Sequence, residues 1–219
     1  MATRSYFDEE LKNLHQNILL MSAMVEEMLA NSVKALKEHD IELGQKVIDD
    51  DDAVDVKEIE IQDFCTKLIA KQHPLAKDLR LVTAALKIIG DLERIADNAV
   101  DIAKIVIRLS NEEYMKPLID IPRMADLTIT MLKDAIDSYV KEDISFANEV
   151  SLRDDQIDGL FKQIYLELLT HMMEDPKKIT QATHFIFVAR YLERVADHTT
   201  NICESVLYLV TGEYKDLND

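Results

Sequence analysis

Apolar residues recur every three or four positions along nearly the whole chain of 219 residues, and this spacing predicts long amphipathic α-helices. The spacing is most regular between Leu81 and Leu109, where it alternates between four and three residues, as in helices that pack along a partner helix. Cap residues and prolines divide the pattern into six helices. We expect them near residues 7–38, 40–71, 75–109, 122–141, 143–173 and 176–212.

The second half of the chain repeats the first. A shift of 103 residues aligns Asp40 with Asp143, each of which precedes a predicted helix, and a shift of 100 aligns residues 92–97 (L-E-R-I-A-D) with residues 192–197 (L-E-R-V-A-D). The difference of three residues falls in the loop before the last helix of each half. Each half is therefore one unit of three helices.

We expect an all-α fold of two tandem three-helix bundles, six long helices in total, related by this internal repeat. The predicted repeats are residues 1–113 and 117–219, and the stretch 111–120, which contains Pro117, is the candidate linker. Four Gly, four Pro and no Trp fit this fold, because tight hairpin turns need more of the first two residues.

The chain is strongly acidic, with 42 Asp and Glu against 25 Lys and Arg and a net charge of −17. Such a surface repels the phosphate backbone of nucleic acids and anionic lipids, so neither is an expected partner. It attracts cations, either metal ions or a basic patch on another protein.

The cysteines and the lack of long apolar runs indicate where in the cell the protein is expected. Cys65 and Cys203 lie far apart in predicted helices, which indicates buried thiols in a reducing environment. No signal core and no apolar run of about 18 residues occur, so no transmembrane segment is expected. We expect a soluble cytoplasmic protein.

Acidic residues form a column on the third predicted helix, with a spacing of four. Like charges one turn apart destabilise a helix slightly, so an ordinary exposed acidic face is the simplest interpretation. The column nevertheless recurs in the sixth helix, and its first glutamate borders apolar positions in both copies. The two columns are Glu93, Asp97 and Asp101 in the first repeat and Glu193, Asp197 and Asn201 in the second. We therefore favour metal binding, because carboxylates one turn apart can share a hard cation such as Mg²⁺ or Mn²⁺ or bridge iron ions.

A second acidic set lies at core positions of the second and fifth helices. It comprises Asp51 with Asp55, and Asp154 with Asp158. An ionised Asp facing a core is costly unless it is paired or coordinated. Use in a metal or polar network, a locally exposed helix end, and a salt bridge to Lys or Arg all stay open for this set.

No catalytic motif accompanies the carboxylates. The chain contains no E-x-x-H pair of the kind that di-iron bundles need, no H-E-x-x-H motif and no Gly-rich phosphate loop. We expect a protein that is not an enzyme. A metal-dependent carboxylate-bundle enzyme and a metal-free acidic helical adaptor for a basic partner are the alternatives.

The duplicated L-E-R-[IV]-A-D motif, each copy followed by N/H-x-x-[DN]-I, resembles the PhoU family of phosphate-signalling regulators. The resemblance extends from about Phe7 to Gly212 and includes A-K-D-L-R-L-V (76–82), H-M-M-E-D-P (171–176) and N-I-C-E (201–204). It implies a cytoplasmic, all-helical accessory protein of the phosphate-specific ABC transporter. Such a protein would negatively regulate the phosphate-starvation response, between the transporter and a membrane sensor histidine kinase. The resemblance also implies a homodimer that reaches the membrane only through its partners.

The resemblance further implies multinuclear metal clusters held by E(D)-x-x-x-D motifs. By position, these motifs are Glu93 with Asp97 and Glu193 with Asp197, extended by Asp101 and Asn201. The acidic set on the second and fifth helices also matches acidic positions of the family. The resemblance favours iron as the metal, with zinc, manganese and magnesium as alternatives. Because Asn201 replaces a carboxylate, we expect the second site to hold fewer ions or a weaker one.

Overall fold

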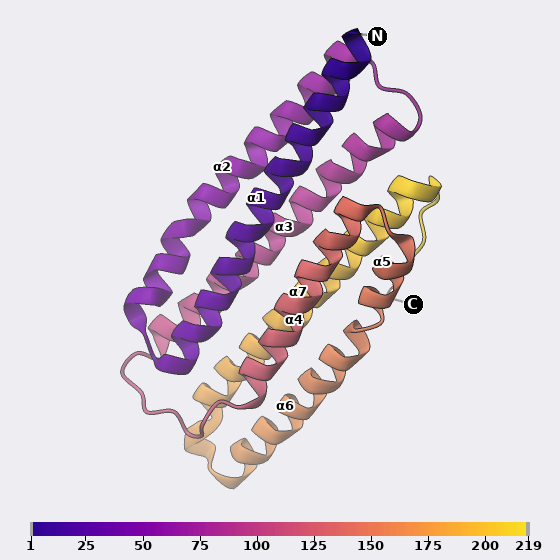
Figure 1. The fold of residues 1–219 in the computed structure, drawn as a ribbon. Helices are drawn as coiled ribbons and strands as arrows, with labels where there is room; N and C mark the ends of the chain where they lie inside the picture. The colour runs from indigo at the N-terminus through magenta and orange to yellow at the C-terminus, as the bar shows by residue number, and fades with distance from the viewer. Residues whose placement is uncertain (1, 218–219) are drawn as a thin grey trace.

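The structure, a computed structural model, describes the backbone of residues 2–217 and contains helices and no strand within that range (Figure 1). Residues 1, 218 and 219, at the outer ends of the two predicted repeats, lie outside the described residues. No helix in the described range is both long enough and apolar enough to cross a membrane. The helices are α1 (Ala2–Glu38), α2 (Ile41–Gln72), α3 (Lys77–Arg108), α4 (Asp120–Lys141), α5 (Ile144–Ser151), α6 (Asp154–Glu174) and α7 (Ile179–Thr211), with a 3₁₀ turn at Pro176–Lys178.

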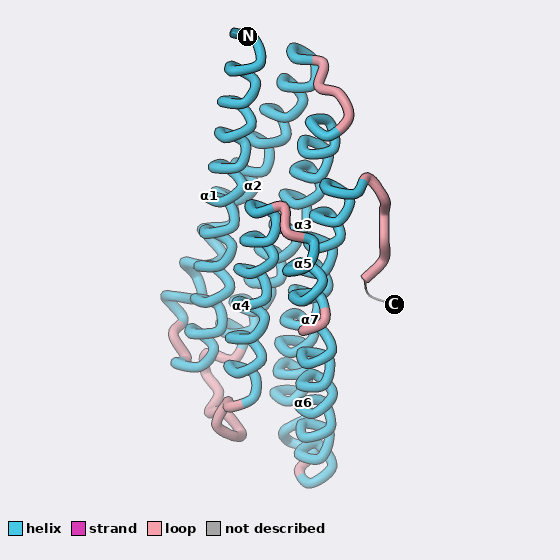
Figure 2. Tube along the Cα trace, turned by 45° about the vertical axis from the view of Figure 1, so that its right-hand side comes forward, coloured by secondary structure: helices cyan, strands magenta, loops and turns pink. Residues whose placement is uncertain are grey.

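Two three-helix units lie side by side, as the repeat predicts. In the first, α1 packs against α2 and α3, and in the second, α7 packs against α4, α5 and α6. The helices of both units run along nearly the same axis (Figure 2). The units meet through α3 with α7 and through α1 with α4. The all-α class, the two bundles and the internal repeat are thus confirmed.

The central pair, α3 and α7, is antiparallel (Figure 1), and its contacts show how the repeats are related. Asn201 Nδ2 donates a hydrogen bond to Asp91 Oδ1 at 3.2 Å. At the equivalent positions one hundred residues away, burial and then the nearby charge of Asp101 raise the pKa of the Tyr191 phenol. Each pair is the image of the other under exchange of the repeats, so a pseudo-twofold axis passes between α3 and α7.

One continuous core joins the two units. Its members include all the regularly spaced apolar positions from Leu81 to Leu109 on α3, and those from Phe185 to Leu209 on α7. The thiols of Cys65 and Cys203 are buried in it, as predicted. Because α3 and α7 have neighbours on several sides, they are apolar around most of their circumference, which fits the central helices of a bundle.

Local side-chain chemistry fixes the helix ends. Asp40 and Asp143 accept hydrogen bonds from the backbone amides of Leu43 and Phe146, at 2.9 and 3.0 Å, which confirms both as N-caps. Gly212 ends α7 with φ of 82°, in the left-handed region where a residue without Cβ is unstrained.

The fifth helix differs from the prediction, which had one unbroken helix over residues 143–173. The structure divides it at Leu152 and Arg153 into α5 and α6. Ser151 Oγ donates to the carbonyl of Asn148, and the amide of Arg153 bonds to Val150, three residues back instead of four. Side-chain bonds of this kind compete with the regular helical ladder, and a periodicity of apolar residues does not reveal them.

The linker between the units is held at several points. Gln181 on α7 accepts from the amide of Met115 at 2.6 Å and donates to the carbonyl of Glu113 at 3.0 Å. Tyr114 donates to the carbonyl of Leu36 at the end of α1, at 2.9 Å. The linker therefore binds to both units and sets their relative position.

Candidate metal-binding site

In the first repeat, α2 packs along α3 and the two acidic sets face each other. Burial, followed by the charges of Asp55 and Asp97, raises the pKa of Asp51 to about 6. Burial and the charge of Asp97 also raise the pKa of Glu93, and Glu58 on α2 contributes to the shift. Since carboxyl groups on each helix respond to charges on the other, the two sets form one acidic site.

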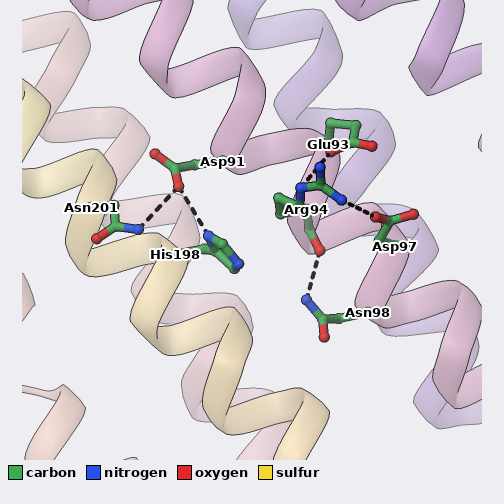
Figure 3. A network of polar contacts seen from close by, with 7 residues as sticks. All are labelled: Asp91, Glu93, Arg94, Asp97, Asn98, His198 and Asn201. Atoms are coloured by element: carbon green, nitrogen blue, oxygen red, sulfur yellow. Dashed lines mark hydrogen bonds and ion pairs between the residues drawn. The ribbon is translucent and has the colours of Figure 1, made fainter.

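Arg94 neutralises part of this site (Figure 3). Its Nε lies 3.3 Å from Glu93 Oε2, and its Nη1 lies 3.0 Å from Asp97 Oδ2. One guanidinium thus joins the two carboxylates of the predicted E-x-x-x-D motif. The side chain of Arg94 is 59% exposed, so each of these ion pairs is screened by water.

The second repeat has the same arrangement on α6 and α7. Burial, followed by the charges of Asp158 and Asp197, raises the pKa of Asp154 to about 6. Burial raises the pKa of Glu193 to about 7, in spite of the opposing charge of Arg190. The pKa of Asp197 is raised as well, chiefly by burial. Predicted ligands from two helices again converge on one acidic site.

This second site leaves carboxylate oxygens without partners. Glu193 is only 9% exposed, and its Oε1 is in an ion pair with Arg190. Its Oε2 and Asp154 Oδ1 are buried and have no hydrogen-bond partner among the described residues. Buried anionic oxygens in this state cost free energy unless a proton or a cation reaches them. A groove of about 470 Å³, lined by Glu193, Asp158 and Tyr165, lies beside this site.

The third residues of the two columns are directed elsewhere. Asp101 is in an ion pair with Lys104 at 3.1 Å, and Asn201 donates to Asp91 at the α3–α7 interface. His198 Nδ1 lies 3.0 Å from the same Asp91 oxygen (Figure 3). Asn201 thus has its polar partner at the interface between the repeats, whereas Asp101 is neutralised by Lys104, whose charge also acts on Asp51 in the first acidic site.

The core aspartates Asp51 and Asp154 were open to a salt-bridge explanation from the sequence. Neither forms an ion pair with a Lys or Arg of the described chain, and both are half-buried, Asp51 inside α2 and Asp154 as the first residue of α6. Nearby carboxylates raise the pKa of both residues, although the charge of Lys104 opposes this shift at Asp51. A direct salt bridge therefore does not account for either residue, and the helix end at Asp154 is half-buried and not exposed.

The side chains are not arranged as a finished coordination shell. Among the described residues, no group of three or more His, Cys, Asp or Glu side chains is close enough to hold one metal ion. Ion pairs with Arg94 and Arg190 take up oxygens that a cation would need. The unpartnered oxygens of Glu193 and Asp154 nevertheless match the oxygen ligands that hard cations prefer. The residues of the second site therefore fit a cation.

Three further residues, two beside the acidic sites and one at the interface between the repeats, were not predicted from the sequence. The charge of Glu58 on α2 acts on Glu93; Glu58 follows Asp51 by seven residues on the same helix face, and this register marks it although it was not predicted as a site residue. Arg190 pairs with Glu193 from one turn before it, where the first repeat has Gly90, so the repeat gives no sign of it. Asp91 engages Asn201 across the α3–α7 interface, which only the packing of the two repeats defines.

Comparison with known proteins agrees with the repeat. The family model described as "PhoU domain" matches the chain twice, over residues 18–106 and 121–206. Each match contains one three-helix unit with its acidic site. The chain belongs to the PhoU family.

Relatives and solved structures match over nearly their whole length. A phosphate-specific transport system accessory protein PhoU homolog of Clostridium acetobutylicum is 43% identical over 218 residues, 99% of this chain and 100% of that protein. The phosphate-specific transport system accessory protein PhoU of Escherichia coli is 34% identical over 207 residues. The match covers 94% of this chain and 86% of that protein. The crystal structure of PhoU from Pseudomonas aeruginosa superposes with a TM-score of 0.90 at 34% identity, covering 94% of this chain and 100% of that one.

Proposed function

We propose that this protein is a negative regulator of phosphate uptake and of the phosphate-starvation response. The observation that carries this proposal is the match along the full length of the chain to proteins named phosphate-specific transport system accessory proteins. The duplicated PhoU domain supports it, because the chain superposes on a solved PhoU structure with a TM-score of 0.90 over 94% of its length.

The proposal assigns the chain a position between two membrane partners. It would bind subunits of the phosphate ABC transporter and a sensor histidine kinase, as a cytoplasmic homodimer that reaches the membrane through them. A surface with a net charge of −17 suits partners that present basic patches. The role proposed here is regulatory and not catalytic.

The acidic sites would hold metal ions, of which the family resemblance favours iron. Asp51, Asp55, Glu93 and Asp97 would hold ions in the first repeat, and Asp154, Asp158, Glu193 and Asp197 in the second. A bound cation would supply positive charge that offsets repulsion among these carboxylates. Because each site joins two helices, it would tie α2 to α3 and α6 to α7, and so stiffen the surfaces that partners meet.

Deletion of the gene tests the regulatory proposal. In high phosphate, the deletion strain should express alkaline phosphatase and take up phosphate as if starved, and a wild-type copy should restore repression. Unchanged phosphatase expression and uptake in the deletion strain would contradict the proposal.

A second arm separates a metal-dependent role from a metal-free acidic adaptor. A copy with Glu193→Gln and Asp197→Asn should restore repression only weakly if bound cations shape the docking surface, at normal protein levels on an immunoblot. Binding of partner subunits should likewise weaken when a chelator is added to a pull-down. Full repression by the variant together with chelator-resistant binding would favour the adaptor.

A further inference from the structure

The two acidic sites differ in how arginine side chains pair with their carboxylates. In the first repeat, Arg94 contacts both carboxylates of the E-x-x-x-D motif, at 3.3 Å from Glu93 and 3.0 Å from Asp97. A metal ion at these carboxylates has to displace a guanidinium that is already bound. Such a competitor lowers the affinity for the metal by the free energy needed to break these two ion pairs.

In the second repeat, the equivalent arginine does not perform this role. Arg194 forms no ion pair within the described chain, and Arg190 contacts Glu193 from one turn before it. The charges of both arginines act on Asp197, but neither is in an ion pair with it. That contact uses Oε1 alone and leaves Glu193 Oε2 and Asp154 Oδ1 buried without partners. A cation arriving here gains these oxygens without first breaking an ion pair to them.

The cause of the difference lies in one pair of aligned positions. Gly90 in the first repeat corresponds to Arg190 in the second, and it has no side chain that could reach Glu93. In the first motif, Arg94 is therefore in ion pairs with both carboxylates. In the second motif, Arg190 is in an ion pair with Glu193 and not with Asp197. The asymmetry is thus built into the sequence of α3 and α7.

We propose that the two sites load cations in a fixed order, the second repeat first, because Arg94 acts as an internal competitor at the first site. This inference rests on the proposed metal binding of the acidic sites. It reverses the expectation drawn from Asn201, which the structure places at the α3–α7 interface and not among the unpartnered oxygens.

Displacement of Arg94 is sterically possible. Its side chain is 59% exposed, and it also lines a groove of about 520 Å³ between α3 and α7. Asp91 and Glu204 line the same groove and offer the released guanidinium other carboxylates. Loading of the first site would therefore move a positive charge toward the interface between the repeats.

Titration of the full-length, chelator-treated protein with Mn²⁺ tests the order, by calorimetry and by the loss of the free-ion electron paramagnetic resonance signal. We expect a tighter and a weaker class of sites. Glu193→Gln with Asp154→Asn should remove the tighter class, and Glu93→Gln with Asp97→Asn the weaker one. Circular dichroism melts would confirm that each variant is folded.

Substitution of the arginine is the decisive variant. Arg94→Gln should strengthen the weaker class by about three- to tenfold, since it removes two exposed ion pairs. Arg94→Lys, which keeps the charge but cannot bridge both carboxylates, should strengthen it less. Arg123→Gln, at an exposed position of α4 remote from both acidic sites, is the matched control and should change either class less than about twofold.

Two outcomes contradict the inference in distinguishable ways. If the wild type binds Mn²⁺ but Arg94→Gln leaves the weaker class unchanged, or the tighter class disappears with Glu93→Gln and Asp97→Asn, the proposed order is wrong and the metal sites stand. If the wild type binds neither Mn²⁺ nor Fe²⁺, the proposed metal binding fails, and the order fails with it.

Discussion

Individual carboxyl groups in the acidic sites are held in an environment that favours their neutral form. Burial raises the pKa of Asp154 to about 6 and that of Glu193 to about 7. In the unfolded chain both groups titrate near pH 4. Without a bound cation, these residues therefore oppose folding at neutral pH, and a cation would remove that cost.

The pH dependence of stability tests this statement for Glu193. Between about pH 4.5 and pH 7 the folded protein binds a proton at Glu193 that the unfolded chain does not, so this group makes stability fall as pH rises. Glu193→Gln cannot titrate. In chelator, its free energy of unfolding relative to wild type should increase by roughly 2 kcal/mol from about pH 4.5 to about pH 8, measured by urea denaturation.

The matched control for this series is Glu9→Gln at an exposed position of α1. Its difference from wild type should stay constant within about 0.5 kcal/mol over the same range. Parallel pH profiles for wild type and Glu193→Gln would contradict the raised pKa of Glu193.

At the scale of residues, the sequence predicted which carboxylates belong to the candidate sites. It did not predict which of their oxygens form ion pairs or hydrogen bonds. The spacing of Glu93 and Asp97, and its repetition at Glu193 and Asp197, was sufficient to mark both columns. The pairing of Arg94 with two carboxylates, and of Asn201 with Asp91, depends on rotamers and on a partner helix. Periodicity along one helix contains neither kind of information.

At the scale of helices, positions and caps followed from apolar spacing and a few residues. Asp40 and Asp143 cap the helices that they precede, and Gly212 ends α7. The division between α5 and α6 was not predictable, because the apolar spacing continues through it while the backbone ladder does not. Helix ends set by caps are readable in a sequence, and breaks set by backbone competition are not.

Two glycines with opposite backbone requirements provide a test at this scale. Gly212→Ala should lower the free energy of unfolding by about 1 kcal/mol, because φ of 82° is strained for a residue with a Cβ. Gly159→Ala, in regular helix with nothing within 4 Å of the added methyl group, should raise it by about 0.5–1 kcal/mol. Thermal melts of both variants would show shifts of opposite sign, and shifts of equal sign would contradict the assigned conformations.

At the scale of the whole molecule, the repeats are joined by a shared core and by a bound linker. The pseudo-twofold axis between α3 and α7 gives both acidic sites the same relation to the interface between the units. The sequence predicted two units, and their number and order are confirmed. The sequence did not predict that α3 and α7 form the main contact between the units. Both helices are apolar over most of their surface, so the pattern does not indicate which side faces the other unit.

Gln181→Leu tests the role of the linker. It leaves the amide of Met115 and the carbonyl of Glu113 without their partner, which should cost about 1–3 kcal/mol. Protease should then cut within residues 110–119 faster than in wild type. Thr183→Ala, which removes a hydroxyl bonded only within α7, is the control and should leave cleavage unchanged. Equal cleavage of Gln181→Leu and wild type would show that Gln181 does not hold the linker.

The central claim is that the paired acidic sites bind metal ions, and anomalous scattering from crystals grown with Mn²⁺ or Fe²⁺ tests it most directly. The account predicts anomalous peaks that are strong above the metal edge and weaken sharply below it. These peaks should place ions among Asp154, Asp158, Glu193 and Asp197, and at higher metal concentration also among Asp51, Asp55, Glu93 and Asp97. Crystals in which metal-specific peaks are missing from both sets of carboxylates, at concentrations that saturate binding in solution, would contradict it.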